Sequence, residues 1–503
     1  MTNLAELVRA AAAARPDHPA YVSRTEVLTW GQVDQRVDRA ARALTERSLA
    51  PGDRVAILLN NRPEMAIFYW AILRAGLVAV PLNPALTAHE VSRLVTESGA
   101  RLLLHETATT RAASMKAAAL EKRNSDVEVI ALGSDAGQEL VGAGRSTRGA
   151  FAGPRTTDRE LAVLMFTSGS EGSPKGAMLS HGALRSNVAA VAKLRRPPAL
   201  TQDDRLLIVL PLSHIYGLNA GLGLAAQVGA TSVLLNRFDP RESLQLIRER
   251  DVTVIVGAPS MYVAWSAEGS LREATDGVRL FISGAAPLPP AVFQQFRTIT
   301  GKPIWEGYGL TETSPVVTSA LASKAARPGS VGRPISGVQV SLRDVDGRDV
   351  REGDPGEVCV KSKGLLSGYW PDGAPAVDAD GWFHTGDIAI LDEDGDYRLV
   401  DRRKDVILVS GFNVYPREVE QVLLEHPAVA EAAVVGVPHP LTGETVKAVV
   451  VLSKGVPEPD DLRAFCEARL ARFKCPSIVE FVSRLPRAAS GKITRRRLRD
   501  ARP

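Results

Sequence analysis

Short apolar runs alternate with amphipathic helical stretches over the first two thirds of the chain. Apolar residues recur at helical spacing in 31–46 and 64–74. Between and after these helices lie short apolar runs typical of buried strands, at 55–59, 77–80, 102–104, 127–131, 206–210, 232–235, 253–256, 280–283 and 303–305. Strands that alternate with helices in this way predict mainly parallel, helix-covered sheets of the α/β class.

The last third of the chain has a different pattern. From residue 331 the apolar segments are short and separated by turns, and Asp394-Gly395 predicts a hairpin turn between Ile390 and Leu399. From about residue 404, a helix is expected at 416–424, two strands at 431–435 and 446–451, and another helix at 459–471. A chain of 503 residues is long enough for about two to four units, and its last hundred or so residues suffice for a small α+β domain.

Composition and charge narrow the function only slightly. The apolar and charged fractions, 45% and 23%, are ordinary for a globular protein, and the net charge of +4 is too small to predict a nucleic-acid partner. Arginines gather near the C-terminus, either as a solvated tail or as a patch that meets polyphosphates. Three cysteines without C-x-x-C spacing predict neither a disulfide framework nor a zinc site, and they favour a cytoplasmic location.

Two apolar segments need an explanation other than targeting or membrane insertion. Residues 1–21 form an alanine-rich pattern that contains Glu6 and Arg9, and they predict an amphipathic helix rather than a signal peptide. The longest uncharged run, 215–235, contains several glycines and Asn219. It predicts a buried helix and strand rather than a membrane span.

The most informative segment is Met165–Gly176, which reads Met-Phe-Thr-Ser-Gly-Ser-Glu-Gly-Ser-Pro-Lys-Gly. Glycines allow backbone N–H groups to approach an anion closely, the hydroxyl groups add donors, and Lys175 adds a positive charge. A P-loop needs two glycines five residues apart, followed by Lys and Ser or Thr; here Gly169 and Gly172 are three apart and a glycine follows the lysine. The segment therefore predicts a phosphate-binding loop of another kind, with a surface turn as the alternative.

The segment Trp305–Thr313 adds groups that suit a nucleotide. Two glycines flank Tyr308, whose ring can stack on adenine. Thr311 can donate to a phosphate, and the carboxylate of Glu312 is a hard oxygen ligand suited to Mg²⁺. A dinucleotide-binding motif is excluded, because Glu312 occupies the place of its third glycine.

Six further segments accompany these two, namely Pro211–Gly217, Ser283–Pro287, Gly381–Asp387, Asp401–Asp405, Ser410–Pro416 and Pro486–Lys492. In this order the segments resemble the adenylate-forming superfamily, which includes acyl-CoA ligases, coumarate–CoA ligases, luciferases and the adenylation domains of peptide synthetases. The resemblance covers nearly the whole chain. It implies a large N-terminal domain at 1–402, with helix-covered mixed sheets and a small β-barrel-like subdomain. It also implies a hinge at 403–404 and a small, mobile α+β domain at 405–503.

The resemblance implies which residues form the site. The nucleotide would be bound by Thr167, Ser168, Gly169, Ser170, Gly172, Lys175, Gly284, Ala285, Ala286, Glu306, Gly307, Tyr308, Gly309, Thr311, Asp387 and Arg402. The acyl pocket would contain His214, Tyr216, Ala220, Ala285 and Gly309, and the CoA tunnel would be bordered by Ser410, Gly411 and Phe412. The catalytic residues would be Lys492, Thr311, Glu312 and His214, with Mg²⁺ held by Glu312 through ATP and the hinge at Lys404.

The superfamily chemistry has two steps. A carboxylate attacks the α-phosphorus of ATP to give acyl-AMP and pyrophosphate, and the thiol of CoA then attacks the acyl carbonyl and releases AMP. The resemblance therefore implies ATP, CoA and a small carboxylic acid as substrates, with Mg²⁺ as cofactor, no nucleic acid, and a homodimer as a compatible assembly. Because Lys492 serves the first step and Gly411 the second, a rotation about Lys404 is expected between them.

One position departs from the superfamily pattern. The loop commonly reads Thr-Ser-Gly-Thr-Thr-Gly, whereas here Glu171 stands beside the expected triphosphate. Like charges about 4–6 Å apart would cost about 1–4 kcal/mol at intermediate dielectric. Either Glu171 points to solvent or to Mg²⁺, or the use of ATP is impaired and the enzyme makes the thioester from a preformed acyl-AMP.

The expected substrate is a medium or long, polycyclic or aryl carboxylic acid. Amino-acid-adenylating relatives keep an acidic residue near the position of His214, and none is present at 213–215. Acetate-specific relatives close the pocket with a tryptophan where this chain has Gly309, and Ala220 and Ala285 are also small. An acyl-AMP ligase that loads a carrier protein is one alternative, although no insertion that hinders domain rotation is evident. A non-catalytic relative that binds adenylate is the other.

Overall fold

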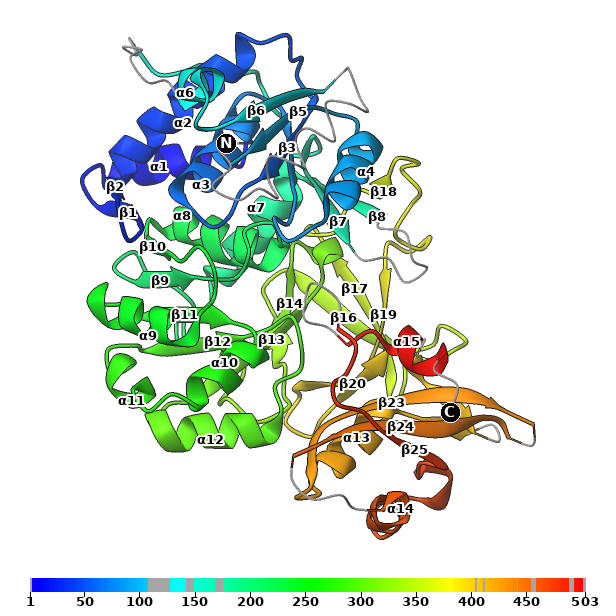
Figure 1. The fold of residues 1–503 in the computed structure, drawn as a ribbon. Helices are drawn as coiled ribbons and strands as arrows, with labels where there is room; N and C mark the ends of the chain where they lie inside the picture. Colours follow the sequence, from blue (N-terminus) through cyan, green and yellow to red (C-terminus); the bar gives the residue numbers. More distant parts are fainter. Residues whose placement is uncertain are drawn as a thin grey trace. The chain divides into compact units, whose positions relative to one another are not determined.

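The computed structural model describes residues 2–106, 127–141, 149–167, 175–402, 405–409, 412–440, 442–453, 458–487 and 493–500. The chain groups into two compact units (Figure 1). The first contains Met1–Gln339 and Val360–Phe383, and the second contains Val340–Cys359 and His384–Pro503.

The first unit contains a nine-stranded sheet. Its strands, in spatial order, are β15 (Arg333–Pro334), β14 (Val316–Ser319), β13 (Ile304–Gly309), β12 (Leu280–Ser283), β11 (Val254–Gly257), β9 (Arg205–Ile208), β10 (Thr231–Leu234), β1 (Pro19–Val22) and β2 (Val27–Thr29). The central strands are parallel, and β2, β14 and β15 are antiparallel at the edges. Segments that follow β9, β12 and β13 therefore emerge at the same edge of the sheet, where open α/β sheets bind ligands.

A second sheet of the same unit has seven strands, in the order β18 (Tyr369–Trp370), β8 (Lys175–Ser180), β7 (Leu161–Thr167), β4 (Val78–Pro81), β3 (Arg54–Leu58), β5 (Ala100–His105) and β6 (Glu128–Ala131). Strands β3, β4, β5, β6 and β7 are parallel to one another. At one edge β8 turns back antiparallel to β7, and β18 pairs antiparallel with β8. Tyr369 is thereby brought beside a strand that lies almost two hundred residues earlier in the chain.

Helices cover both sheets of the first unit. One continuous core joins strands of both sheets to α1 (Glu6–Ala14), α2 (Trp30–Thr45), α3 (Pro63–Arg74), α7 (His181–Val191), the π-helix η1 (Tyr216–Gly223) and α8 (Leu224–Val228). The other face of the nine-stranded sheet packs against α9 (Pro240–Glu249), α10 (Pro259–Ser266), α11 (Leu271–Ala274) and α12 (Pro290–Thr300) (Figure 1). The α4 helix (Ala88–Ser98) covers the other face of the seven-stranded sheet, and α6 (Asp135–Val141) follows β6. Nearly every side chain of α3 is buried, as expected for a helix between two sheets.

The second unit contains two smaller sheets. A four-stranded sheet has the order β16 (Val338–Arg343), β17 (Gly356–Ser362), β19 (Phe383–Leu391) and β20 (Tyr397–Arg402), and its first residues are grouped with the first unit. The other sheet has the order β22 (Phe412–Val414), β21 (Ile407–Val409), β24 (Gly443–Leu452) and β23 (Val429–His439), with β25 (Ile478–Phe481) beside β24. Helices α13 (Pro416–Leu424) and α14 (Pro459–Glu467) share its main core, and α15 (Arg495–Asp500) contributes to a smaller one.

Most of the predicted elements are confirmed, including the α/β class and the hairpin turn at Asp394-Gly395, where β19 pairs with β20. The helix expected over 1–21 is too long. It ends at Ala14, and Pro19–Val22 forms β1, because the prolines at 16 and 19 interrupt the helical hydrogen bonds. The uncharged run 215–235 forms η1, α8 and β10. No helix in the described ranges has the length and apolar character needed to cross a lipid bilayer.

The predicted domain boundary and the grouping of contacts differ in one respect. The contacts place most of the four-stranded sheet with the C-terminal part, whereas the predicted boundary at 403–404 places it with the N-terminal domain. Residues 403 and 404 lie outside the described residues, so the hinge at Lys404 stays a prediction.

Candidate functional site

The described ends of the predicted phosphate loop lie on adjacent antiparallel strands. Thr167 ends β7, Lys175 begins β8, and the two residues are paired, with the Thr167 hydroxyl 3.4 Å from the carbonyl oxygen of Lys175. Ser168, Gly169, Ser170, Glu171 and Gly172 fall outside the described residues. The Lys175 side chain is exposed, and its Nζ lies 5.8 Å from the centroid of the Tyr369 ring. A positive charge therefore stands at the exit of the loop.

The segment 310–316, here called the Glu312 turn, follows β13 and contains Thr311 and Glu312 in a short 3₁₀ helix, η2 (Thr311–Thr313). Ser314 has a φ of 67°, in the left-handed region that side chains other than glycine rarely adopt. Such a conformation persists only where the surroundings hold it.

Two buried asparagines hold the Glu312 turn. Asn187, on α7, donates to the carbonyl oxygens of Thr313 and Val316 at 3.2 and 2.8 Å and accepts from the N–H of Val316 at 3.2 Å. Asn219, on η1, donates to the carbonyl oxygen of Ser314 at 2.6 Å. Neither side chain is more than 4% exposed. The side-chain contacts that these two helices make to the backbone of the turn therefore come from neutral amides.

Glu312 itself is held by the segment that contains β18. The Tyr369 hydroxyl donates to Oε1 of Glu312 at 3.0 Å, and the N–H of Leu366 donates to the Glu312 carbonyl oxygen at 2.9 Å. Burial raises the pKa of Tyr369 above its ordinary value, and the negative charge of Glu312 raises it further. No described lysine or arginine forms an ion pair with Glu312, so the carboxylate keeps a charge and a second oxygen for another partner. This donor suits Mg²⁺, which prefers carboxylate oxygen.

Strand β13 brings the residues predicted to border adenine close to the Glu312 turn. A Cβ atom on Gly309 would lie 1.9 Å from the carbonyl oxygen of Pro315, so only glycine permits this approach of the two segments. Tyr308 is 8% exposed. Gly307 lies on the same strand, and a side chain there would also come near β14.

Glu306 has a structural use that the sequence did not reveal. Its Oε2 accepts from the N–H of Leu288 at 3.1 Å, and its Oε1 accepts from the N–H of Gly329 at 3.1 Å. The buried carboxylate therefore joins the segment after β12 to the segment before β15.

The structure brings two of the predicted pocket segments into contact. A Cβ atom on Gly284 would lie 2.9 Å from the ring of Tyr216, at the start of the π-helix η1. Ala285 has a φ of 68°, and Ala286 follows it in an exposed position. Burial raises the pKa of Tyr216, which keeps its hydroxyl protonated. Ala220 lies on the same π-helix, a type of helix that is frequent at functional sites.

His214 lies just before η1 and is exposed. Its Nδ1 accepts from the N–H of Tyr216 at 3.2 Å, which fixes the ring beside the predicted acyl wall. The gate role assigned to His214 stays a prediction.

In the second unit, Asp387 and Arg402 are cross-strand neighbours on β19 and β20, as two residues that act on one ligand would need. Asp387 is 7% exposed; the Arg402 side chain is outside the described set. The adjacent Asp401 accepts from the N–H of Arg417 at 2.8 Å and lies 3.8 Å from Arg495. Burial lowers the pKa of the Arg417 guanidinium, and the carboxylate of Asp401 counteracts that effect.

The remaining predicted residues are only partly described. Ser410, Gly411, Lys404 and Lys492 lie outside the described residues. Phe412 is 56% exposed and stacks on Phe473, with ring centroids 4.8 Å apart and an interplanar angle of 29°. A solvent-facing aromatic pair is compatible with a ligand-binding border.

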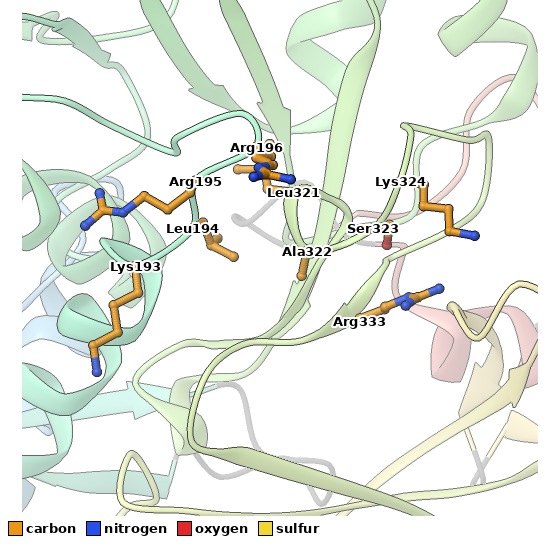
Figure 2. A pocket seen from close by; sticks show the side chains of 9 residues that line it. All are labelled: Lys193, Leu194, Arg195, Arg196, Leu321, Ala322, Ser323, Lys324 and Arg333. Carbon is orange, nitrogen blue, oxygen red and sulfur yellow. The ribbon is translucent and has the colours of Figure 1, made fainter.

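A hollow of about 510 Å³ in the first unit is lined by Lys193, Leu194, Arg195, Arg196, Leu321, Ala322, Ser323, Lys324 and Arg333. Figure 2 shows Lys193 and Arg195 extending to one side of it and Lys324 to the other, so these cations do not converge on one point. None of the predicted site residues lines this hollow. It is therefore distinct from the segments that the sequence assigned to the acyl pocket.

Sequence reasoning missed three residues that hold the site: Asn187, Asn219 and Tyr369. The two asparagines lie on helices, where their partners depend on tertiary contacts. Tyr369 belongs to an aromatic pair between Gly368 and Pro371, and this pair was the one local signal. The position of this aromatic pair in the sequence does not indicate that Tyr369 contacts Glu312.

Comparison with known proteins identifies the family. The AMP-binding enzyme family matches residues 8–370, and the AMP-binding enzyme C-terminal domain matches residues 418–492. A long-chain-fatty-acid–CoA ligase of Yersinia pestis is 35% identical over 532 residues, covering 99% of this chain and 94% of the relative. A feruloyl-CoA synthase of Amycolatopsis sp is 36% identical over 477 residues, covering 94% and 93%.

Among solved structures, ATP-bound MatB from Rhodopseudomonas palustris is similar over 99% of this chain and 98% of its own, with a TM-score of 0.89 and 33% identity. The family matches cover both parts of the chain, and the sequence and structural similarities extend over nearly its full length. The chain therefore belongs to the AMP-binding enzyme family and is an acid–thiol ligase of the adenylate-forming superfamily.

Proposed function

We propose that the protein activates a medium or long, polycyclic or aryl carboxylic acid with ATP and transfers the acyl group from acyl-AMP to CoA. The observation that carries the proposal is the grouping of Glu312, Tyr369 and Lys175 at the described end of the phosphate loop. A carboxylate without an ion pair among the described residues, and a lysine near the same tyrosine, suit the metal-bound triphosphate of ATP.

In the first step, negative charge accumulates on the phosphoryl oxygens as the substrate carboxylate attacks the α-phosphorus of ATP. Lys175 and Lys492 supply positive charge, Thr311 donates a hydrogen bond, and Glu312 would hold Mg²⁺. Bound Mg²⁺ would neutralise part of the charge on the phosphate oxygens. Asp387 and Arg402 are proposed to bind the ribose, and Tyr308 to stack on adenine.

In the second step, the acyl-AMP is already an activated ester. A thiol of ordinary pKa, about 8.5, needs positioning and partial deprotonation more than further activation. Ser410, Gly411 and Phe412 are the proposed border of the CoA tunnel. Because Lys492 and Gly411 act in different steps, the proposal includes a rotation about Lys404 between them.

The choice of acid rests on the small residues of the proposed acyl pocket. Ala220 and Ala285 have small side chains, which would leave room for an apolar group, and the Tyr216 ring lies against Gly284. The space beside Gly309 is occupied by the carbonyl group of Pro315, so this glycine does not itself support a wide pocket. The named substrates of two relatives, a long-chain fatty acid and a feruloyl group, are of the long and aryl types.

A panel of carboxylic acids, incubated with protein, ATP, Mg²⁺ and CoA, tests the proposal when products are identified by mass spectrometry. We expect CoA thioesters of long or aryl acids and none of acetate. A parallel incubation without CoA should release pyrophosphate. Thioester formation from supplied acyl-AMP without any pyrophosphate release would instead support the alternative that Glu171 impairs the use of ATP. Transfer to a carrier protein but not to CoA would support the second alternative.

Substitution of Lys492 by Ala separates the two steps. The expected result is a loss of pyrophosphate release, with thioester formation from supplied acyl-AMP largely retained. Equal loss of both reactions would contradict the proposed division of roles.

A further inference from the structure

Tyr369 lies between the two charged residues at the end of the phosphate loop. Its hydroxyl is 3.0 Å from Oε1 of Glu312, and the Nζ of Lys175 lies 5.8 Å from the centroid of its ring. No ion pair within 4.0 Å joins Lys175 to Glu312, although both are among the described residues. One aromatic side chain is therefore a neighbour of both charged groups, which do not form an ion pair with each other.

The backbone around Tyr369 is fixed independently of its side chain. The N–H of Ser367 donates to the carbonyl oxygen of Met178 at 2.9 Å, and the N–H of Met178 donates to Gly368 at 3.1 Å. On the other side, the N–H of Leu366 donates to the carbonyl oxygen of Glu312 at 2.9 Å. The segment 366–370 therefore connects β8, which begins at Lys175, to the Glu312 turn. A change confined to the Tyr369 hydroxyl leaves these connections in place.

The hydroxyl is well suited to orient a carboxylate that binds a metal. Hydrogen bonds to such carboxylates fix their direction, and their loss typically lowers metal affinity about 10–100-fold. A lysine in the same place would neutralise the carboxylate, whereas a neutral hydroxyl orients it and leaves its charge.

We propose that Tyr369 is a positioning residue for the adenylation step. Its hydroxyl orients Glu312 toward the metal of the ATP complex, and its ring separates Glu312 from Lys175, so that both charges act on the triphosphate. This inference rests on the proposed function, in which Glu312 holds Mg²⁺.

The direct test measures binding rather than turnover. Affinity of the full-length protein for α,β-methylene-ATP is determined by calorimetry with and without Mg²⁺. Wild-type protein should gain affinity from Mg²⁺. Tyr369→Phe keeps the ring. In this variant the increase in affinity caused by Mg²⁺ should be about tenfold smaller than in wild type, while the affinity without Mg²⁺ stays within about twofold of wild type.

A double-mutant cycle shows whether Tyr369 acts through Glu312. Glu312→Gln should remove most of the Mg²⁺ gain, and adding Tyr369→Phe to it should have no further effect. Independent, additive losses would overturn the inference. Tyr397→Phe is the matched control, because Tyr397 is also partly buried and its hydroxyl donates to a backbone carbonyl, that of Val340, at 3.3 Å.

Two activities distinguish failure of the inference from failure of the proposed function. Tyr369→Phe should need about tenfold more Mg²⁺ for half-maximal pyrophosphate release and should form thioester from supplied acyl-AMP at the wild-type rate. If Mg²⁺ increases the nucleotide affinity of Tyr369→Phe as much as that of wild type, the inference about Tyr369 is wrong and the proposed function is unaffected. A wild-type protein without any Mg²⁺ gain would overturn the role of Glu312 and, with it, this inference.

Discussion

The Glu312 turn and the surroundings of Asp401 hold their carboxylates in opposite ways. Around Glu312 the described partners are neutral: two asparagine amides, a tyrosine hydroxyl and backbone groups. Around Asp401, which is 3% exposed, Arg417 and Arg495 approach, and Arg495 also binds Glu420 through both carboxylate oxygens at 2.9 and 3.0 Å. The first arrangement leaves the Glu312 charge without an ion pair among the described residues, as the proposed metal site requires, whereas the second places the Asp401 charge next to cations of the protein itself.

This comparison shows that a carboxylate in a motif is best interpreted from its partners. Both acids lie in segments that resemble the superfamily, and nothing in the local sequence distinguishes them. A charge held by neutral donors is available to a cation, whereas a buried carboxylate that accepts from a backbone N–H and lies near a guanidinium group supports the fold at the cost of desolvation.

The largest expected effect comes from removing the charge of Glu312. Glu312→Gln should lower kcat/KM for pyrophosphate release about 10³-fold, because the metal ligand is lost, while the free energy of unfolding changes by less than about 0.5 kcal/mol. Pyrophosphate release and chemical denaturation of the same samples provide the measurements. A large loss of stability in Glu312→Gln would show that Glu312, like Asp401, stabilises the fold.

The second-largest effect should be a loss of stability at low pH, through His181 on the helix that also carries Asn187. His181, at the start of α7, accepts from the N–H of Leu4 at 3.1 Å, and burial lowers its pKa from 6.5 to about 4. Because the folded state favours the neutral ring, stability should fall as pH drops from 6.5 toward 4, by up to about 3 kcal/mol. Denaturation curves at several pH values measure the decrease in the free energy of unfolding. His181→Asn should remove the part of this decrease that comes from protonation of His181. An unchanged pH profile in the variant would contradict the assignment to His181.

A smaller effect is expected from weakening the neutral support of the turn. Asn187→Ala leaves the backbone groups of Thr313 and Val316 without this partner, so the free energy of unfolding should fall by about 2 kcal/mol and pyrophosphate release by about tenfold. Asn83→Ala is the control, since Asn83 only accepts from the N–H of Ala85. Normal pyrophosphate release in Asn187→Ala would show that the Glu312 turn keeps its conformation without the hydrogen bonds of Asn187.

The smallest effect should come from the paired carboxylate. Asp401→Asn keeps an oxygen for the N–H of Arg417 but removes the charge near Arg495, which retains Glu420. We expect a loss of about 1 kcal/mol in stability and nucleotide affinity within about threefold of wild type. If Asp401→Asn instead abolished pyrophosphate release without loss of stability, the contrast with Glu312 would be wrong.

Much of the fold followed from the chain's own periodicity. The helix predicted at 416–424 has those bounds in the structure, and most parallel strands of the first unit lie within a few residues of the predicted apolar runs. Periodicity failed where its signal was absent. The glycine-rich run after Ile215 has no polar face, so a π-helix was not distinguishable from an α-helix, and the alanine-rich N-terminus hid the strand at Pro19–Val22.

The sequence by itself determined the order of buried strands, the composition of each motif and the family to which the motifs belong, because these depend on neighbours along the chain. Only the tertiary structure decided that Tyr369 contacts Glu312, 57 residues away, and lies beside Lys175. That contact requires β18 to pair with β8, and pairing between distant strands is fixed by packing of the whole unit rather than by local pattern. In the second unit, tertiary contacts likewise decide that Asp401 lies next to Arg417 and Arg495, which its local sequence does not show.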